Sequence, residues 1–215
     1  DRSSAASDVY KRQALAWLLP SEGQIHPVQA LQALAAQATA HGVEWHWGSL
    51  VQETAAGALV ADGQRHAFDH VFDVRGVGAK PAVPVRGVRG EVFWLHAPGV
   101  PLQRPVRLLH PRHSIYMVPR PGDVIVVGAS EIESEDRSPV SLRSTLELLS
   151  AAHSAIPALA EARVVHTETN LRPALPDNLP AMRHAPGLTV INGLFRHGWL
   201  IAPALVEQAL QELLP

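Results

Sequence analysis

The sequence of 215 residues contains no cysteine. Without cysteine the chain can form no disulfide, no thiolate metal site and no cysteine nucleophile, and this fits a reducing compartment. It also has no apolar run near the roughly 20 residues needed to cross a bilayer. The sequence therefore predicts a cytoplasmic protein that does not span a membrane.

An excess of charge of one sign is also missing. The 18 Lys and Arg and the 20 Asp and Glu are interleaved and give a formal net charge of -2. This balance offers no basic face to a phosphate backbone, so we expect no nucleic-acid partner. His110 and His113 lie close together in the sequence, but His, Asp and Glu are not grouped as ligands, and we expect no metal site. The sequence contains no nucleophile-elbow pattern, so we do not expect a hydrolase.

What is present is a large apolar fraction, 47% of the residues, divided into short runs by 18 prolines and 15 glycines. This texture predicts a mixed α+β fold. Apolar residues at spacings of three to four predict helices over 27–41, over 139–152 with Ser138 as N-cap, and from Pro203 onward. In the second helix the spacing predicts a buried face of Leu142, Leu146, Leu149 and His153. Strand-like runs occupy 43–47, 58–60, 70–74, 92–96, 106–110, 115–118, 124–128, 163–168 and 188–192.

Two segments have the composition of a binding site. In 170–180 (NLRPALPDNLP) one arginine lies on a proline-stiffened loop, and a guanidinium fork suits bidentate binding of a carboxylate. In 192–203 (NGLFRHGWLIAP) two glycines bracket an arginine before the helix expected from Pro203, whose N-terminus favours an anion. Gly198 leaves room for a planar ring. Such a junction can also be a plain α/β turn, and a loop arginine is often only a solvated charge.

Longer stretches resemble the FAD-dependent glycine oxidase / D-amino-acid oxidase family, in particular the glycine oxidases of thiamine biosynthesis. They are RPVRLLHPRHSIYMVPRPGDVIVVGASEIESEDRSPVS, NLRPALPDNLPAM and NGLFRHGWLIAPALVEQAL, together with GQIHPVQALQALAAQATAHGVEW and FDVRGVGAK upstream. The resemblance implies a partial FAD-binding Rossmann-like domain and an antiparallel-sheet substrate domain with helices on one face. The expected parts are a tail and the end of a truncated element (1–22), a portion of the FAD domain (23–79), the substrate-binding domain (80–168) and the carboxy-terminal portion of the FAD domain (169–215).

The resemblance also assigns site residues. Arg172 would pair with the carboxylate of the amino acid and Tyr116 would add its hydroxyl. Arg196 would line the site. Glu131 occupies a position that faces the substrate pocket in relatives and varies among them, where a carboxylate would either tune substrate choice or point to water. Contacts with the cofactor are implied for Val51 at the adenine, for Arg75, Gly76 and Gly78 near the flavin or its ribityl chain, and for Leu194, Phe195, Arg196, His197, Gly198, Trp199, Leu200 and Ile201 at the isoalloxazine.

The implied reaction is oxidative deamination of glycine or a similar small amino acid or amine. A hydride would pass to flavin N5, the imine would hydrolyse, and dioxygen would reoxidise the FAD with formation of hydrogen peroxide. The alternatives are a D-amino acid, sarcosine or a modified-nucleotide aminomethyl group as substrate. A homo-oligomer is left open.

One part of the family pattern does not occur in these 215 residues. Family members bind the pyrophosphate of FAD with a strand, a GxGxxG turn and a helix, whereas Gly76-Val77-Gly78 is too short to replace that turn. We therefore expect the chain to bind FAD weakly or not at all. The alternative from another functional class is an inactive, cofactor-free fragment.

Overall fold

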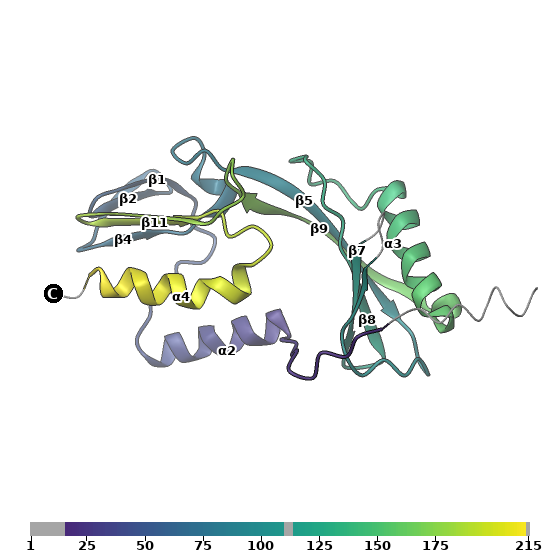
Figure 1. Ribbon diagram of the computed structural model, residues 1–215. Helices are drawn as coiled ribbons and strands as arrows, with labels where there is room; N and C mark the ends of the chain where they lie inside the picture. The colour runs from purple at the N-terminus through teal and green to yellow at the C-terminus, as the bar shows by residue number, and fades with distance from the viewer. Residues whose placement is uncertain (1–15, 110–113, 214–215) are drawn as a thin grey trace, which may run out of the picture.

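A computed structural model describes residues 16–109 and 114–213 of the chain (Figure 1). The described residues form the expected mixed α and β fold. Its largest element is a five-stranded antiparallel sheet in the order β6-β7-β8-β5-β9. The strands are β5 (Arg86–His96), β6 (Val106–Leu109), β7 (Ser114–Arg120), β8 (Val124–Gly128) and β9 (Arg163–Ala174).

The predicted hairpin is confirmed in this sheet. β7 and β8 pair antiparallel and are joined by Pro121, Gly122 and Asp123. Gly122 and Asp123 have φ angles of 76° and 57°, a left-handed conformation that glycine adopts freely and that aspartate tolerates better than most residues. The turn residues therefore fix the register that places Tyr116 beside Gly128.

Helix α3 (Leu142–Ala155) covers one face of the five-stranded sheet, while α2 and α4 lie on its other side (Figure 1). Phe93, Met117 and Val127 of the sheet form a core with α3 and with the 3-10 helix η2 (Pro157–Glu161). The side chains that α3 buries are Ser144, Leu148, Ala151 and Ala152.

Two predictions about α3 were wrong. The N-cap is Ser141, whose hydroxyl accepts a hydrogen bond from the Ser144 N–H at 3.1 Å, whereas the Ser138 hydroxyl bonds to Asp136. Leu142 and Leu146 are 74% and 59% exposed, because the buried stripe follows Leu148 and two alanines that allow close approach to the sheet. Apolar spacing alone did not distinguish the two stripes.

Two smaller sheets and two further helices complete the fold. β4 (Val71–Asp73) pairs parallel with β11 (Leu188–Asn192), which pairs antiparallel with β10 (Ala181–Ala185). The other sheet consists of β1 (Val51–Ala55), β2 (Ala58–Ala61) and β3 (Gln64–Ala67). Helix α4 (Gly198–Gln211) runs along the sheet that contains β11, with α2 (Pro27–Ala40) beyond it (Figure 1). The β4–β11 pair joins chain segments more than one hundred residues apart.

Three further expectations need correction. Residues 43–47 form no strand, because the rings of Trp45 and Trp47 stack at 5.0 Å and Trp45 Nε1 donates to Thr39 Oγ1. Helix α4 begins at Gly198, so Pro203 lies inside it. Arg172 lies within β9, not on a loop. The same strand crosses the domain boundary expected between 168 and 169, and the division into domains remains a prediction.

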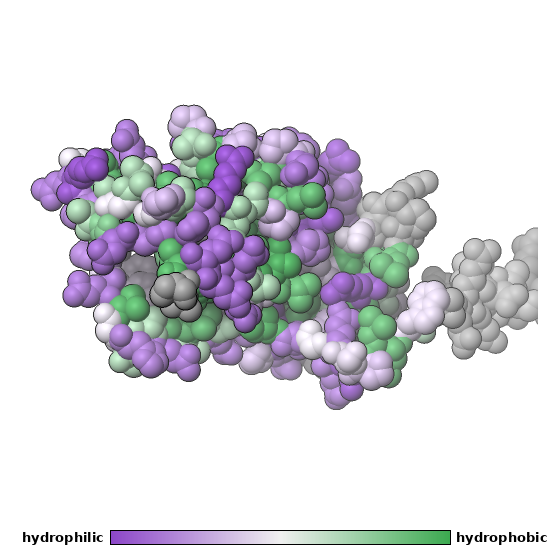
Figure 2. Space-filling model, turned by 60° about the vertical axis from the view of Figure 1, so that its left-hand side comes forward, coloured by the Kyte–Doolittle hydropathy of each residue, from purple (hydrophilic) through white to green (hydrophobic). Residues whose placement is uncertain are grey.

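Apolar side chains remain exposed around α2 and α4. No side chain of α2 is buried, and the exposed large apolar residues of the two helices are Val28, Leu31, Leu34, Trp199, Leu200, Val206 and Leu210. Figure 2, in which the side of the molecule bearing the small sheets comes forward, shows hydrophobic surface open between polar side chains. Within the described ranges no helix has the length and the apolar run that crossing a membrane requires.

Candidate functional site

Two glycines on the central strands make room for the predicted substrate-binding side chains. Tyr116 on β7 pairs with Gly128 on β8, and a Cβ at Gly128 would lie 2.5 Å from the Tyr116 hydroxyl oxygen. Arg172 on β9 lies over Gly90 on β5, where a Cβ would lie 2.5 Å from Arg172 Cζ. Both side chains therefore fold inward over the middle of the sheet, on the face away from α3.

The Arg172 guanidinium has no carboxylate partner among the residues that the structure describes. Its Nη1 donates to the carbonyl oxygen of Ser130 at 3.0 Å. Burial raises the pKa of the nearby Tyr116 hydroxyl, while the positive charges of Arg172 and Arg120 act in the opposite direction. The phenol is therefore protonated at neutral pH and can donate a hydrogen bond, so the two side chains suit a small anion.

These side chains open into a cavity of about 1200 Å³. It brings together all four predicted substrate residues, of which Arg196 was also predicted at the cofactor, and two further predicted cofactor residues: Tyr116, Glu131, Arg172, Arg196, His197 and Trp199. Sequence reasoning missed Arg120, which also lines the cavity and donates from Nη1 to the Gln24 amide oxygen at 3.0 Å. Its place at the end of β7, four residues after Tyr116, could have indicated it.

Arg196 differs from Arg172 in having an internal counterion. Its Nη1 lies 2.9 Å from Glu131 Oε2, and its guanidinium carbon lies 5.2 Å from the centroid of the Phe195 ring. The two charged groups come from different connections: Glu131 follows β8, and Arg196 lies between β11 and α4. Of the two arginines predicted for the site, Arg172 has the less compensated charge.

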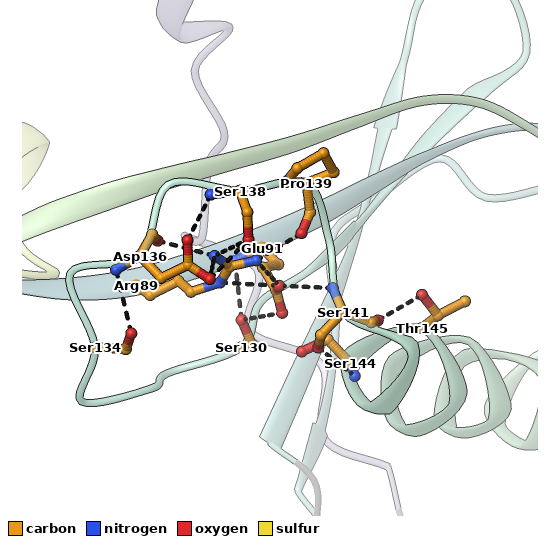
Figure 3. Close-up of polar contacts among 10 residues, drawn as sticks. All are labelled: Arg89, Glu91, Ser130, Ser134, Asp136, Ser138, Pro139, Ser141, Ser144 and Thr145. Carbon is orange, nitrogen blue, oxygen red and sulfur yellow. Dashed lines mark hydrogen bonds and ion pairs between the residues drawn. The ribbon is translucent and has the colours of Figure 1, made fainter.

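A buried ion pair between Arg89 and Glu91 holds Ser130 in place (Figure 3). Ser130 is the residue whose carbonyl oxygen accepts from Arg172. Arg89 and Glu91 on β5 are 4% and 0% exposed, and Arg89 Nη2 lies 2.6 Å from Glu91 Oε1. Glu91 also accepts from the Ser130 hydroxyl at 3.1 Å and from the Ser141 N–H at 2.9 Å. Arg89 donates to the carbonyl oxygens of Asp136 and Pro139.

Glu91 is ionised in this network. Burial alone would raise its pKa, but hydrogen bonds from Ser144, Arg89, Ser141 and Ser130 outweigh it, and the net pKa lies below the ordinary value. One carboxylate thus connects β5 to Ser130 and to the start of α3. Sequence reasoning missed this pair, although two charged residues at alternate positions in the apolar run VRGEVFWL were a usable signal.

The β11–α4 connection places a helix N-terminus beside the same cavity. The connection is tied to β9 by the Phe195 N–H, which donates to the Pro173 carbonyl oxygen at 3.0 Å. Gly193 has a φ of 78°, and a Cβ there would lie 2.6 Å from Leu175 Cγ. Because α4 starts at Gly198, its free N–H groups lie only two residues beyond Arg196, closer than expected for a helix starting at Pro203.

The predicted cofactor residues on the amino-terminal side lie near β1, β4 and β11. The Arg75 guanidinium bonds to Asp73, to Thr54 and to the carbonyl oxygens of Val51 and Gln52, which occupies its donors within the protein. Gly76 has a φ of 58°, and its carbonyl oxygen accepts from Asn192 Nδ2 at 2.9 Å. The Gly78 N–H donates to the Arg75 carbonyl oxygen. Arg75 therefore organises these strands through its side chain.

A second, smaller cavity of about 240 Å³ lies next to this region. It is lined by Val74, Gly76, Pro173, Ile191, Asn192, Gly193, Leu194, Ala202, Leu205 and Val206. This set contains two predicted cofactor residues, Gly76 and Leu194. Within residues 16–109 and 114–213, no three His, Asp or Glu side chains are grouped as metal ligands. His110 and His113 lie outside the described residues.

Comparison with known proteins gives the same picture. The family DAO, described as FAD dependent oxidoreductase, matches residues 3–209. The chain is 41% identical over 208 residues to a protein of Rhizobium etli named as a thiamine biosynthesis oxidoreductase ThiO, covering 96% of this chain and 60% of that protein. A crystal structure of glycine oxidase from Geobacillus kaustophilus superposes with a TM-score of 0.76 at 27% identity, over 86% of this chain and 53% of the other.

A glycine oxidase structure from Bacillus cereus, at 22% identity and a TM-score of 0.70 over 80% of this chain and 52% of the other, shares the fold. The chain spans little more than half the length of these relatives. The family match covers almost the whole chain, and the cavity lined by Arg172 and Tyr116 lies within it. The chain belongs to the DAO family of FAD-dependent oxidoreductases.

Proposed function

We propose that the chain forms the substrate-binding part of an FAD-dependent oxidase of glycine or a similar small amino acid. The observation that carries this proposal is the Arg172 guanidinium over Gly90, next to the protonated Tyr116 hydroxyl and facing the large cavity. A planar guanidinium and a phenol at one site can bind a carboxylate through several directed hydrogen bonds. The similarity to ThiO and to glycine oxidase supports the proposal.

The residues present fit a flavin. The N-terminus of α4 supplies free N–H groups and a positive dipole end. Among the described residues, a Cβ at Gly198 would come within 4 Å of Leu194 alone, at 3.8 Å or more. We infer that the backbone of residues 194–201 would contact the ring, with the apolar cavity at Gly76 and Leu194 close by. Val51, Arg75 and Gly78 would contribute through main-chain atoms, since the Arg75 side chain is bonded within the protein.

When bound, FAD would accept a hydride equivalent from the substrate carbon and transfer electrons to dioxygen. The protein would contribute position and charge. Arg172 and Tyr116 would hold the carboxylate and thereby fix the α-carbon relative to the start of α4. Orientation of this kind lowers the barrier by converting an encounter into a preorganised contact. Because the α-hydrogen would leave as hydride, no protein base would be required at the α-carbon.

Glycine and the thiamine pathway are favoured within this proposal because the relative named for thiamine biosynthesis is 41% identical. D-Amino acids, sarcosine and other small amines are the alternatives. Tyr116 and Glu131, which line the cavity from β7 and from the segment after β8, would decide among them.

The proposal is tested with this chain joined to the part of the Rhizobium etli relative that the similarity does not cover, and loaded with FAD. Glycine, sarcosine and D-alanine are supplied in turn, and ammonia or methylamine, glyoxylate or pyruvate, and hydrogen peroxide are measured. We expect glycine to give ammonia, glyoxylate and peroxide in equal amounts. A flavin-loaded protein that oxidises none of these substrates, with dioxygen or with an artificial electron acceptor, would overturn the proposal.

A further inference from the structure

We propose that Glu131 makes the site selective for monocarboxylates, because it neutralises Arg196 and so removes a second anchor for substrate carboxylates. This inference rests on the proposed function, in which Arg172 holds the first carboxylate. Glu131, Arg172 and Arg196 line the same cavity, and the Arg196 Nη1 to Glu131 Oε2 distance is 2.9 Å. The pair would determine specificity without taking part in bond breaking.

Both partners lie on anchored segments. Glu131 follows Ser130, whose hydroxyl bonds to the buried Glu91 carboxylate and whose carbonyl oxygen accepts from Arg172. Arg196 follows Phe195, whose N–H donates to the Pro173 carbonyl oxygen. The backbone therefore brings the two charges together, and less backbone entropy is lost than in an ion pair between two mobile segments.

The remaining arginines that line the cavity have partners that line it too. Arg107 pairs with Glu22, and Arg143 pairs with Glu147. Arg120 donates to the neutral Gln24 amide, which holds its side chain without compensating its charge. Arg172, folded over Gly90 near the Tyr116 hydroxyl, is the cation best placed for a substrate carboxylate.

A second carboxylate would have to approach Glu131 or displace it from Arg196. Like charges at close range act against the wrong ligand, which is a common means of specificity. The Arg196 and Glu131 side chains are 54% and 44% exposed, so solvent screens the pair and the discrimination should be moderate. Glu131→Gln removes the carboxylate but keeps the shape of the side chain. It should both relieve the repulsion of a second substrate carboxylate and free the Arg196 guanidinium to bind it.

The test uses the 215-residue chain labelled with ¹⁵N and follows the arginine Nε–H signals by NMR. Acetate is titrated as the monocarboxylate, and malonate, succinate and glutarate are titrated as dicarboxylates of increasing span. In the unchanged protein we expect acetate to shift the Arg172 signal, and at least one dicarboxylate to bind several-fold more weakly than acetate because its second carboxylate meets Glu131. In Glu131→Gln at least one dicarboxylate should gain about fivefold in affinity relative to acetate and shift the Arg196 signal.

Two variants control the result. Arg196→Gln in the Glu131→Gln background should abolish the gain, because the second anchor is then missing. Glu161→Gln frees Arg163 from an exposed pair that does not line the cavity, and it should give no gain. A gain that persists without Arg196, or no gain for any dicarboxylate while acetate binding still depends on Arg172, would overturn this inference alone. Acetate binding that is absent or independent of Arg172 would overturn the proposed function as well.

Discussion

At the scale of single residues, two missing side chains shape the site. Gly90 and Gly128 sit where a Cβ would overlap the Arg172 guanidinium and the Tyr116 ring. Both functional groups are ends of long side chains that could swing away. The glycines therefore select the position of Arg172 and Tyr116 more than they stabilise the sheet.

Gly90→Ala should displace Arg172 and weaken acetate binding by about tenfold or more, because loss of a charge partner typically costs about 2–5 kcal/mol. Folding should change by less than about 1 kcal/mol, since Arg172 can move and alanine is tolerated in a strand. NMR titration measures the first effect and urea unfolding the second. Gly78→Ala, whose Cβ would lie at an ordinary 3.5 Å from Arg75 Cβ, is the control. Unchanged acetate affinity in Gly90→Ala would show that Gly90 does not set the position of Arg172.

The sequence contained part of this site. A loop-like arginine motif and the family resemblance were enough to select Arg172, Tyr116, Glu131 and Arg196, all of which line one cavity. The two glycines beneath these side chains, Gly90 and Gly128, could not be predicted, because their places depend on strand register: Gly128 pairs with Tyr116, and Gly90 lies diagonally across from Arg172. Strand register is a tertiary property, and a shift of one residue would place different side chains over Gly90 and Gly128.

At the scale of secondary structure, α3 shows where periodicity was ambiguous. Leu148 is buried against the sheet, whereas Leu146 is 59% exposed. Leu148→Ala should destabilise the protein by about 2–5 kcal/mol through loss of buried surface and creation of a cavity. Leu146→Ala should change stability by less than about 0.5 kcal/mol. Urea unfolding of the two variants checks this, and equal losses would mean that the helix face is assigned wrongly.

The Glu91 carboxylate, which connects β5 to the start of α3, gives a second prediction at this scale. Glu91→Gln should destabilise the protein near neutral pH toward the lower end of the roughly 3–5 kcal/mol typical of a broken buried pair, because buried Arg89 loses Glu91 and keeps only the exposed Asp136 carboxylate, 3.1 Å away. Arg89→Met/Glu91→Leu, which removes both charges, should cost less than the single change.

The effect should depend on pH. The Glu91 pKa is lower in the folded protein than its ordinary 4.5, so its contribution is full above that value and is lost as pH falls through the folded pKa. Thermal unfolding from pH 7 to pH 3 should therefore show the difference between the original protein and Glu91→Gln shrinking in the acid range. A difference that stays constant down to pH 3 would show that Glu91 is not held ionised by the network.

Most helices and strands were predictable from the sequence, but the residues at which they begin and end were not. The runs at 58–60, 115–118, 124–128 and 188–192 all form strands, because short apolar stretches between turn residues favour them. The polar strands β1, β3 and β10 were missed, since their backbone pairing, not their side-chain pattern, holds them in place. The start of α4 was placed too late because Pro203 is also compatible with the interior of that helix.

At the scale of the whole molecule, exposed apolar surface predicts association. Val28, Leu31 and Leu34 on α2 and Leu200, Val206 and Leu210 on α4 are each at least half exposed. Contiguous apolar surface of this kind promotes self-association. Sedimentation of the 215-residue chain should show a molecular mass that increases with concentration, and Leu31→Lys/Leu34→Lys should reduce the effect. A strictly monomeric chain at high concentration would contradict this.

A second prediction at the scale of the whole molecule concerns FAD binding by the 215-residue chain alone. GxGxxG, whose backbone N–H groups cradle the pyrophosphate of a dinucleotide, does not occur among the 215 residues. We expect the purified chain to contain no stoichiometric flavin and to bind added FAD weakly, as measured by quenching of flavin fluorescence. Purification with one tightly bound yellow flavin per chain would show that the remaining contacts suffice.

The most direct test of the central claim, that Arg172 holds the carboxylate of an amino acid presented to a flavin, is anaerobic mixing of glycine with the FAD-loaded fusion described above. Flavin absorbance is followed without an electron acceptor, so the result depends only on oxidation of the substrate. We expect glycine to bleach the flavin, Arg172→Ala to lower the second-order rate by a few orders of magnitude, and Arg172→Lys to recover only part of it, with flavin content unchanged. Bleaching by glycine at the same rate in Arg172→Ala would contradict the account.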